Sequence, residues 1–249
     1  MSLDGSVVVL TGSAGALGSA LARRFAEVGC AVVLSDVNRS ALDTQVAGLG
    51  KEFPSVEVTS LSVDVGDPQQ MENLIQHAQD AFGRVDVMIN NAGVLNSNGR
   101  IHNLPPEDWQ KTIHVNLMGA VNGIASAVRS MRPRGVGSII NTASAAGLTA
   151  WPYASAYGAT KAAVIHLTRI AAVEYARDGI RVNCVCPGTF RSAIHDGLPE
   201  EAMEAMAVKH PLGLGSPADL TDAYLYLAGD GSKWTTGSAL VVDGGYSAP

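Results

Sequence analysis

The feature that most restricts the fold is a buried strand that runs into a glycine-rich turn and then into a helix. Residues 7–10 are all apolar, which is typical of a strand buried on both faces of a sheet. They lead into Thr11-Gly12-Ser-Ala-Gly15-Ala16-Leu17-Gly18, and apolar residues then recur at helical spacing until Gly29. Glycine lets a ligand approach the backbone closely, and a helix N-terminus favours a pyrophosphate. In this order the motif predicts a nucleotide site rather than only a tight turn. Its residues are Gly12, Gly15, Leu17 and Gly18.

Strand-like and helix-like segments alternate over the rest of the chain. Runs typical of strands occur at residues 30–36, 56–63, 85–89, 138–142, 181–185 and 239–242. Apolar residues at helical spacing occur at 68–82, 105–131, 153–177 and 217–228. This alternation, without a linker, predicts one α/β domain over residues 1–249. The expected architecture is a Rossmann-like, doubly wound fold, with a mostly parallel seven-stranded sheet and helices on both faces. We expect residues of about 189–215 to form a lid over the substrate.

The second predicted strand ends in an acidic residue, Asp36, eighteen positions after Gly18. A carboxylate at this spacing suits hydrogen bonds to the ribose hydroxyls of NAD. An NADP site would more usually place a basic residue next, and the next residue is Val37. The sequence therefore predicts NAD as the cofactor. The alternative, which does not exclude the first, is that Asp36 caps the helix after Asn38.

A tyrosine and a lysine four positions apart, Tyr157 and Lys161, lie on one face of the helix predicted at 153–177. An ammonium beside a phenol favours the phenolate, so we expect the pKa of Tyr157 to fall below its usual value of about 10. A tyrosine tuned in this way can exchange a proton with an alcohol or carbonyl oxygen. Ser144 follows the strand at 138–142, and its hydroxyl could hold the same oxygen. Tyr-x-x-x-Lys alone is a weak pattern that also occurs on ordinary helix surfaces.

Together with four further motifs, these residues resemble the short-chain dehydrogenase/reductase family over essentially the whole chain. The further motifs are Asn90-Asn91-Ala92-Gly93, Asn116 within Val115-Asn-Leu-Met-Gly119, Pro187-Gly188, and Val242-Asp-Gly-Gly245. The resemblance implies that Tyr157 is the acid/base and that Lys161 lowers its pKa and holds the nicotinamide ribose. It also implies that Ser144 binds the substrate oxygen and that Asn116 positions a water molecule. The structural alternatives are that Asn116 only kinks its helix and that Ser144 caps a strand end.

The resemblance extends the expected NAD site beyond the glycine-rich turn. Besides Tyr157 and Lys161, the added residues are Asp64, Val65, Asn91, Ala92, Gly93, Pro187, Gly188, Phe190 and Ser192. Two departures from the family pattern stand out. Ala16 occupies the place of the middle glycine of the turn, where its methyl group could crowd the pyrophosphate. Phe190 and Ser192 stand where the family often has Ile and Thr; Ser192 keeps a hydroxyl for the carboxamide, and Phe190 makes the pocket wall bulkier.

Composition excludes several other classes of function. The net charge of −6 argues against nucleic acid or an anionic membrane as a partner. A signal peptide is not evident, and no apolar run approaches the roughly 20 residues of a membrane span, so we expect a cytoplasmic protein. Cys30, Cys184 and Cys186 have neither a metal-binding nor a disulfide spacing, and the six histidines are scattered. We therefore expect no metal site.

The expected substrate is an uncharged secondary alcohol or ketone with a bulky alicyclic or aromatic group. This expectation rests on apolar residues near the predicted site: Val94, Leu95, Leu148, Trp151, Tyr153, Phe190, Ala193, Ile194, Leu198, Met203 and Met206. His195 in the same stretch could be neutral, and clustered arginines that would clamp a phosphate or carboxylate are lacking.

Two other functions compete with this interpretation. One is an NADPH-dependent 3-oxoacyl-carrier-protein reductase, for which Arg129, Arg132 and Arg134 could supply a basic patch. Asp36-Val37 speaks against it, as does Asp178, which lies where carrier-protein reductases tend to have a basic residue. The other is a non-catalytic dinucleotide sensor, which would have little need of Ser144, Tyr157 and Lys161 together.

The helices predicted at 105–131 and 153–177 are apolar over more than one face and rich in alanine. One face can pack on the sheet, and the excess predicts burial against another subunit. The family's usual homotetramer agrees with this expectation.

Overall fold

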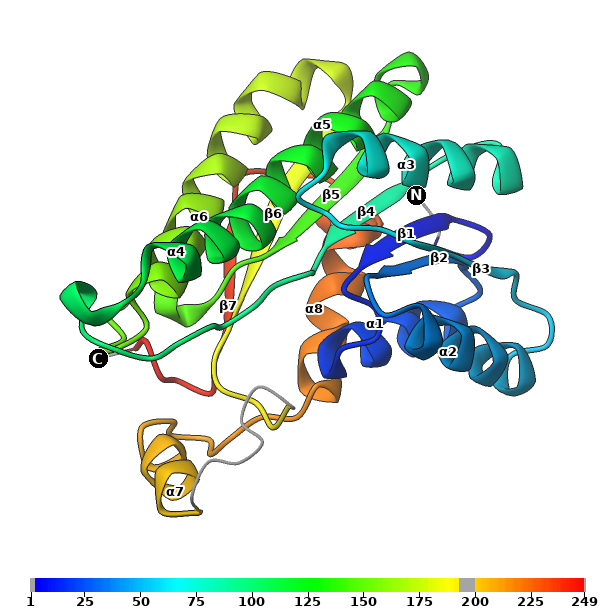
Figure 1. The fold of residues 1–249 in the computed structure, drawn as a ribbon. Coiled ribbons are helices and arrows are strands. Elements are labelled where there is room, and N and C mark those ends of the chain that lie inside the picture. The colour runs from blue at the N-terminus through cyan, green and yellow to red at the C-terminus, as the bar shows by residue number, and fades with distance from the viewer. Residues whose placement is uncertain (1–2, 193–199, 249) are drawn as a thin grey trace.

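The computed structural model describes residues 3–192 and 200–248. Its centre is a seven-stranded sheet with the strand order β3-β2-β1-β4-β5-β6-β7 (Figure 1). All six strand pairings are parallel. The strands are β1 (Val7–Thr11), β2 (Ala31–Asp36), β3 (Val58–Ser62), β4 (Val87–Asn90), β5 (Gly137–Thr142), β6 (Ile180–Pro187) and β7 (Ala239–Val242). The predicted fold class is confirmed, and the sheet is wholly rather than mostly parallel.

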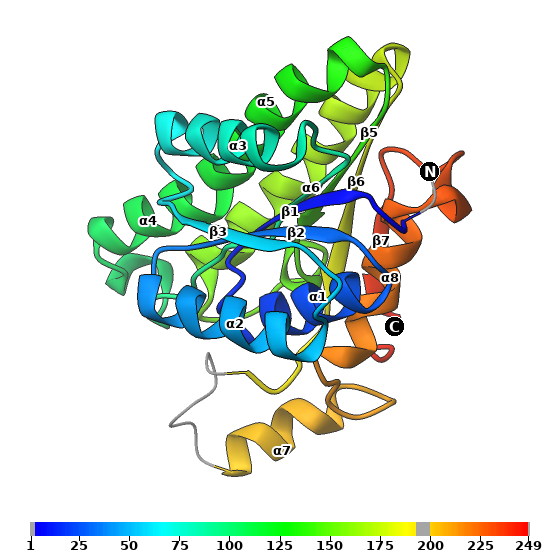
Figure 2. The ribbon, with the colours of Figure 1, turned by 90° about the vertical axis from the view of Figure 1, so that its right-hand side faces the viewer.

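Helices cover both faces of the sheet, as Figure 2 shows from the side. One layer consists of α1 (Ala16–Glu27), α2 (Arg39–Glu52) and α8 (Ala218–Ala228). The other consists of α3 (Pro68–Phe82), α5 (Gly119–Met131) and α6 (Ser155–Tyr175). The side chains of each strand alternate between the two layers, so β1 contributes Val7 and Val9 to one core and Val8 and Leu10 to the other. This double burial explains why the strands are apolar runs rather than alternating patterns.

The helix predicted at 105–131 is interrupted. It consists of α4 (Pro106–Thr112), a π-helical segment at Ile113–Met118, and α5. A π-helical turn widens the backbone by one residue and often marks a functional site. The segment contains Asn116, which is 3% exposed. Helical periodicity alone does not reveal such a local widening.

The predicted lid region contains a short helix, α7 (Glu200–Val208), which the sequence pattern did not indicate. This helix lies apart from the two helical layers, below the edge of the sheet in Figures 1 and 2. Within the described residues, none of the helices combines the length and hydrophobicity needed to span a lipid bilayer.

Candidate active site

A cavity of about 270 Å³ opens at the carboxyl ends of the central strands. Crevices in doubly wound sheets form where the strand order reverses, and here β2 and β4 flank β1 on opposite sides. The lining brings together the glycine-rich turn, the loop after β4, the start of α6 and the loop after β6. It includes Gly12, Gly15, Ala16, Leu17, Gly18, Asp36, Asn91, Ala92, Gly93, Ser144, Tyr157, Lys161, Pro187, Gly188, Phe190 and Ser192.

The glycine-rich turn is shaped for close approach of a ligand. Gly12 has a φ of +62°, and a Cβ at this position would lie 2.7 Å from the Cα of Ala92. A Cβ on Gly18 would collide with the carbonyl oxygen of Gly12. Helix α1 begins at Ala16 with no side-chain cap on its N-terminus. Its first backbone N–H groups therefore remain for an anion such as a pyrophosphate. This geometry fits a dinucleotide, with the exposed methyl group of Ala16 beside the same turn.

Asp36 faces the turn and does not cap α2. Its Oδ2 accepts a hydrogen bond from the backbone N–H of Ala14 at 3.1 Å, and its Oδ1 accepts one from Asn38 at 3.0 Å. The cap of α2 is Asn38, whose side chain accepts from the backbone N–H of Ala41. The alternative interpretation of Asp36 as the helix cap is therefore wrong. The two hydrogen bonds hold the half-buried carboxylate at the edge of the cavity.

Two of the predicted cofactor residues, Asp64 and Val65, do not line the cavity. Asp64 accepts a hydrogen bond from the backbone N–H of Gly66 and pairs with Nε2 of His114 at 3.0 Å. The carbonyl oxygen of the buried Val65 accepts from Asn122 at 2.9 Å. These contacts join the loop after β3 to the π-helical segment and to α5. A role for Asp64 and Val65 in cofactor binding stays a prediction.

Threonines that sequence reasoning did not single out connect the loops around the cavity. Oγ1 of Thr11 accepts hydrogen bonds from the backbone N–H groups of Asn91 and Ala92 at 3.0 and 3.2 Å. The side-chain amide of Asn91 donates in return to the carbonyls of Thr11 and Gly12. Thr142 at the end of β5 is hydrogen-bonded to the hydroxyl of the fully buried Tyr224 at 2.8 Å. These bonds fix the strand ends relative to one another. Their only signal in the sequence is a hydroxyl residue at the last position of an apolar strand.

Ser144, Tyr157 and Lys161 lie together at the inner end of the cavity. Tyr157 is in the first turn of α6, and its hydroxyl lies close enough to Ser144 for that side chain to favour the phenolate. Oγ of Ser144 also accepts from the backbone N–H of Ala146 at 3.1 Å, which caps the short 3-10 helix Ala145–Gly147. Lys161 follows one turn later and is 3% exposed. Its Nζ donates to the carbonyl oxygen of Thr142 at 2.7 Å and lies 5.6 Å from the centroid of the Tyr157 ring.

The ionisation of this group differs from the expectation that Lys161 lowers the pKa of Tyr157. Burial raises the pKa of Tyr157, and the hydrogen bond from Ser144 offsets only part of that increase. The reason is that the ammonium group of Lys161 bonds to Thr142 instead of the phenol. Burial in turn lowers the pKa of Lys161 from 10.5 to about 8, against a smaller opposing effect of Cys186 and Cys184. The sequence correctly indicates that these groups are neighbours, but not the direction of the shift at Tyr157.

Asn116 is held by the loop that follows β4. Its Oδ1 accepts from the backbone N–H of Val94 at 2.7 Å, and its Nδ2 donates to the carbonyl of Val94 at 2.9 Å. A Cβ on Gly93 would lie 3.4 Å from both Oδ1 of Asn116 and Nζ of Lys161. The side chains of Asn116 and Lys161 therefore both approach Gly93, and Asn116 lies in the π-helical segment. The predicted role in positioning water stays a prediction.

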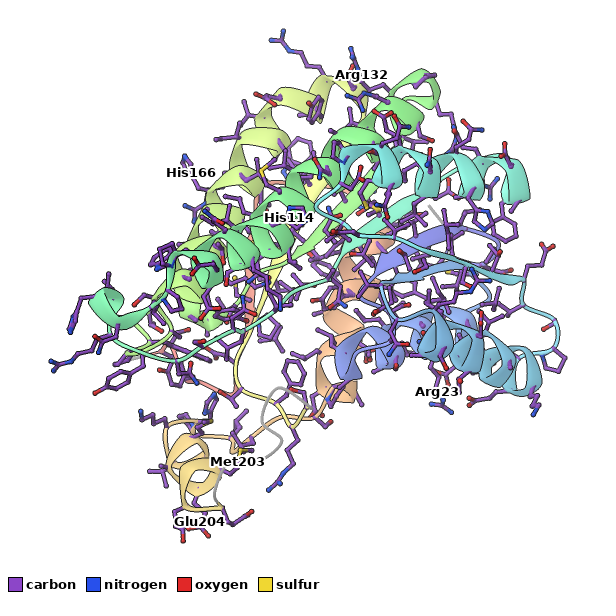
Figure 3. The ribbon with its side chains drawn as sticks, viewed as in Figure 1. Arg23, His114, Arg132, His166, Met203 and Glu204 are labelled. Atoms are coloured by element: carbon purple, nitrogen blue, oxygen red, sulfur yellow. The ribbon has the colours of Figure 1, made fainter. Side chains whose placement is uncertain are left out.

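Fewer of the predicted apolar residues line the cavity than the sequence suggests. Leu95, Trp151 and Phe190 line it, together with Thr142, Ala143 and Thr189, which were not predicted. The other predicted wall residues among the described ones do not line it: Val94, Leu148, Tyr153, Met203 and Met206. Ala193, Ile194, His195 and Leu198 lie outside the described residues. On α7, Met203 is 7% exposed and faces the body of the molecule, whereas Glu204 points away (Figure 3).

The arrangement is suited to proton exchange with an oxygen atom. A substrate oxygen near the hydroxyls of Tyr157 and Ser144 would meet one group able to give or take a proton and a second able to hold it in place. The neighbouring glycine-rich turn fits a dinucleotide, and a nicotinamide dinucleotide bound there would lie beside Tyr157 and Ser144.

Comparison with known proteins gives consistent matches over nearly the whole chain. A family model described as enoyl-(acyl carrier protein) reductase matches residues 12–247. Cis-4-hydroxycyclohexanecarboxylate dehydrogenase of Sinomonas cyclohexanicum is 37% identical, over 97% of this chain and 96% of that protein. A 3-oxoacyl-(acyl-carrier-protein) reductase of Thermotoga maritima is 36% identical, over 98% and 99%. A 3alpha-hydroxysteroid dehydrogenase of Mediterraneibacter gnavus is 34% identical, over 98% of each chain.

A solved structure agrees with these matches. The crystal structure of a short-chain type dehydrogenase/reductase from Mycobacterium marinum superposes with a TM-score of 0.94 at 32% sequence identity, covering 100% of this chain and 98% of that one.

Proposed function

Since this chain belongs to the short-chain dehydrogenase/reductase family of oxidoreductases, we propose that it transfers a hydride between NAD and an uncharged secondary alcohol or ketone bearing a bulky alicyclic or aromatic group. The observation that carries the proposal is the cavity itself. It places Tyr157, Ser144 and the buried Lys161 beside a glycine-rich turn that fits a dinucleotide.

In the proposed reaction, one group of residues binds the cofactor and another transfers the proton. Gly12, Gly18 and the N-terminus of α1 would hold the pyrophosphate, and Asp36 would hold the adenosine ribose. When bound, NAD supplies the acceptor for the hydride. In alcohol oxidation Tyr157, as the phenolate, takes the hydroxyl proton while Ser144 holds the same oxygen. Lys161 would hold the nicotinamide ribose, and its ammonium group lies 5.6 Å from the centroid of the Tyr157 ring. In ketone reduction the proton passes from Tyr157 to the oxygen.

The surroundings of Asp36 support NAD over NADP. Its carboxylate is fixed by two backbone N–H groups at the edge of the cavity, where it would bond a 2′-hydroxyl and repel a 2′-phosphate. The next residue, Val37, is 71% exposed and carries no charge. The nearby Arg39 is already paired with Asp43 at 3.0 Å. A 2′-phosphate on the ribose would therefore lie near the negative charge of Asp36, and the nearby cation, Arg39, already pairs with Asp43.

The character of the cavity supports the proposed substrate. Leu95, Trp151 and Phe190 provide an apolar wall, and the charged residues among its described lining are Asp36 and Lys161. Asp36 belongs to the cofactor end, so the substrate end offers little to clamp a charged group. Two of the relatives are named for alicyclic substrates, a hydroxycyclohexanecarboxylate, which carries a charged carboxylate, and a hydroxysteroid. Both names support the bulky alicyclic group, and the absence of charge rests on the cavity lining alone.

The carrier-protein reductase is the second candidate, because the Thermotoga maritima relative carries that name. The expected basic patch is neutralised within the chain. Arg129 pairs with Glu72 at 2.6 Å, and Arg132 pairs with Asp178 at 3.2 Å. Arg134 pairs with Asp86, which is 2% exposed, at 2.6 Å. Cations engaged in this way offer less to an acidic carrier protein, which favours the alcohol dehydrogenase.

A substrate panel with both cofactors tests the proposal. Cyclic alcohols, aryl alkyl carbinols, sugars and hydroxyacyl thioesters are assayed with NAD and with NADP, and kcat/KM is compared. Cyclic or aryl alcohols with NAD should exceed the other pairs by about tenfold or more, the factor that 1.4 kcal/mol of binding free energy provides. The double variant Asp36→Ala/Val37→Arg should reverse the cofactor preference without changing the order of substrates.

Three outcomes of the panel would contradict the proposal. A wild-type kcat/KM that is higher with NADP than with NAD would contradict the role of Asp36 in selecting NAD. If sugars or charged hydroxy acids were the best substrates, the proposal of an apolar substrate pocket would be wrong. Hydroxyacyl thioesters turned over best with NADP would point to the carrier-protein reductase.

The proposed assembly is a homotetramer. Helix α6 carries exposed apolar side chains at Ile170 and Val173, which are 45% and 82% exposed. The adjoining π-helical segment adds Ile113 and Met118, which are 38% and 39% exposed. Apolar side chains left in this position favour burial against a second copy. Light scattering at micromolar concentration should give the mass of four chains, and a monomer would refute this assembly. The charged variant Val173→Glu should lower the measured mass.

A further inference from the structure

A buried histidine that follows α7 forms hydrogen bonds through both of its ring nitrogens. His210 is 4% exposed, and its Nε2 accepts a hydrogen bond from the backbone N–H of Thr189 at 3.0 Å. Its Nδ1 lies 2.7 Å from the carbonyl oxygen of Met206. Because the N–H of Thr189 can only donate and the carbonyl of Met206 can only accept, Nε2 is the acceptor and Nδ1 the donor in these two hydrogen bonds.

The two partners of His210 belong to different parts of the molecule. Met206 is on α7. Thr189 lies between Gly188 and Phe190 in the loop after β6, and all three line the cavity. The carbonyl of Thr189 accepts from the backbone N–H of Gly215 at 3.2 Å, so this residue is bonded on both sides to the segment that follows α7. The imidazole ring therefore links α7 to the cavity wall.

Aromatic contacts connect the same histidine to the opposite side of the cavity. The ring of Tyr246 lies 4.8 Å from that of His210, with an interplanar angle of 32°. Tyr246 meets Trp151, another lining residue, edge-on at 5.7 Å. Asp243 holds the turn before Tyr246 by accepting from the backbone N–H groups of Gly245 and Ser247 at 2.9 and 2.8 Å. These ring contacts restrict the movement of the His210 side chain.

We propose that His210 is a positioning residue for the reaction: its Nε2 fixes the Thr189 backbone, and with it the cavity wall at Gly188 and Phe190, in the place required for hydride transfer. This inference rests on the proposed function. Without the imidazole acceptor, the N–H of Thr189, a residue that is 7% exposed, would be buried without a partner. The loop would then shift to regain a hydrogen bond, and displacements of about 1 Å near reacting groups can reduce turnover by about 10²-fold.

Three substitutions separate the two hydrogen bonds from the packing of the ring. His210→Gln can place its Oε1 near the position of Nε2 and keeps an acceptor for Thr189. His210→Asn can place its Nδ2 near the position of Nδ1 and keeps only the donor to Met206. His210→Phe keeps a ring against Tyr246 and loses both bonds. We measure kcat, both KM values and the NAD dissociation constant for the wild type and each variant.

The variants without the acceptor should lose turnover. We expect kcat to fall about 10- to 100-fold in His210→Asn and His210→Phe, while the NAD dissociation constant changes by less than about threefold. His210→Gln should retain kcat within about fivefold of the wild type. If His210→Gln falls as far as His210→Phe, the bond to Thr189 is not the cause and the proposal is wrong. If the variants only lower Tm and leave kcat unchanged, the histidine is structural and the proposal is equally wrong.

Hydrogen–deuterium exchange of the peptide covering residues 186–192 gives a readout independent of the reaction. Exchange should be faster in His210→Asn and His210→Phe than in the wild type and close to the wild type in His210→Gln. Unchanged exchange in all three would overturn the proposal. A wild type that prefers NADP or a different alcohol would contradict the proposed function instead, and the ratios of variant to wild-type kcat with that pair would still test His210.

Discussion

Tyr157→Phe should reduce turnover by about 10²–10⁴-fold, the range that general acid–base catalysis contributes, while NAD binds with nearly unchanged affinity. The substitution removes only the phenolic hydroxyl beside Ser144 and keeps the ring at the start of α6. Steady-state kcat and calorimetric titration with NAD measure the two effects. The same substitution at Tyr153, which is 56% exposed and does not line the cavity, is the matched control and should leave kcat unchanged.

The pH dependence provides a second check on Tyr157. Oxidation requires the phenolate, whose fraction increases with pH. Because burial holds the pKa of Tyr157 above its ordinary value, the rate of alcohol oxidation should rise with pH through neutrality. Ketone reduction requires the phenol and should not share that rise. Tyr157→Phe should abolish the increase, and near wild-type turnover in this variant would mean that another group is the acid/base.

Lys161→Met should nearly abolish activity and at the same time stabilise the fold near neutral pH. The loss of a fixed charge in an active site typically reduces turnover by about 10²–10³-fold. The gain in stability follows from burial, because the charged Nζ is 3% exposed and donates to a carbonyl rather than to a carboxylate. The fall in the pKa of Lys161 from 10.5 to about 8 corresponds to a penalty of about 3 kcal/mol.

Part of this gain is lost, because Thr142 then has an unpaired carbonyl oxygen, at a cost of about 1–3 kcal/mol. The net increase in the free energy of unfolding should be about 1 kcal/mol, which raises Tm by roughly 2–4 °C. The penalty in the wild type is fully present below pH 8. It is relieved as pH rises from about 8 to 10.5, since the folded protein has then already released the proton. The stability difference between variant and wild type should therefore shrink over that window.

Thermal unfolding at pH 7 and pH 10 measures this effect. Lys111→Met on the exposed surface of α4 is the matched control and should change the free energy of unfolding by less than about 0.5 kcal/mol. A Lys161→Met variant that is markedly less stable than the wild type at pH 7 would show that the lysine holds the fold together, and the penalty from burial would be refuted.

The parts of the site that follow local rules could be predicted from the sequence. The glycine-rich turn, Asp36 and the pair of Tyr157 and Lys161 each depend on short spacings within one strand–turn–helix unit or one helix. Parallel strands bring their carboxyl ends to the same edge of the sheet, so residues at the ends of strands meet whatever their separation in the chain. This geometry explains why Asn91, Ser144 and Pro187, which the resemblance to the family assigned to one site, line the same cavity.

The features that could not be predicted depend on where the end of a side chain lies in space. A spacing of four residues puts Lys161 beside Tyr157, yet the Nζ of Lys161 donates to the carbonyl of Thr142 rather than to the phenol. Burial therefore decides the direction in which the pKa of Tyr157 shifts. The partners of Arg129 and Arg134 come from distant segments, at Glu72 and Asp86. Asn116, in the π-helical segment, bonds to Val94 in the loop after β4, 22 positions earlier in the chain. None of these contacts leaves a periodic pattern in the chain.

The strand order has a consequence for how such a protein can evolve. In the proposed function, the residues that would hold the pyrophosphate and the adenosine ribose come from the first half of the chain, through β1 and β2. The proposed acid/base, the lysine and the wall after β6 come from the second half, through β5, α6 and β6. The two halves meet along the boundary between β4 and β5. If the proposed function holds, changes to the wall in the second half could alter which substrate fits, while the pyrophosphate and adenosine ribose sites in the first half stay the same.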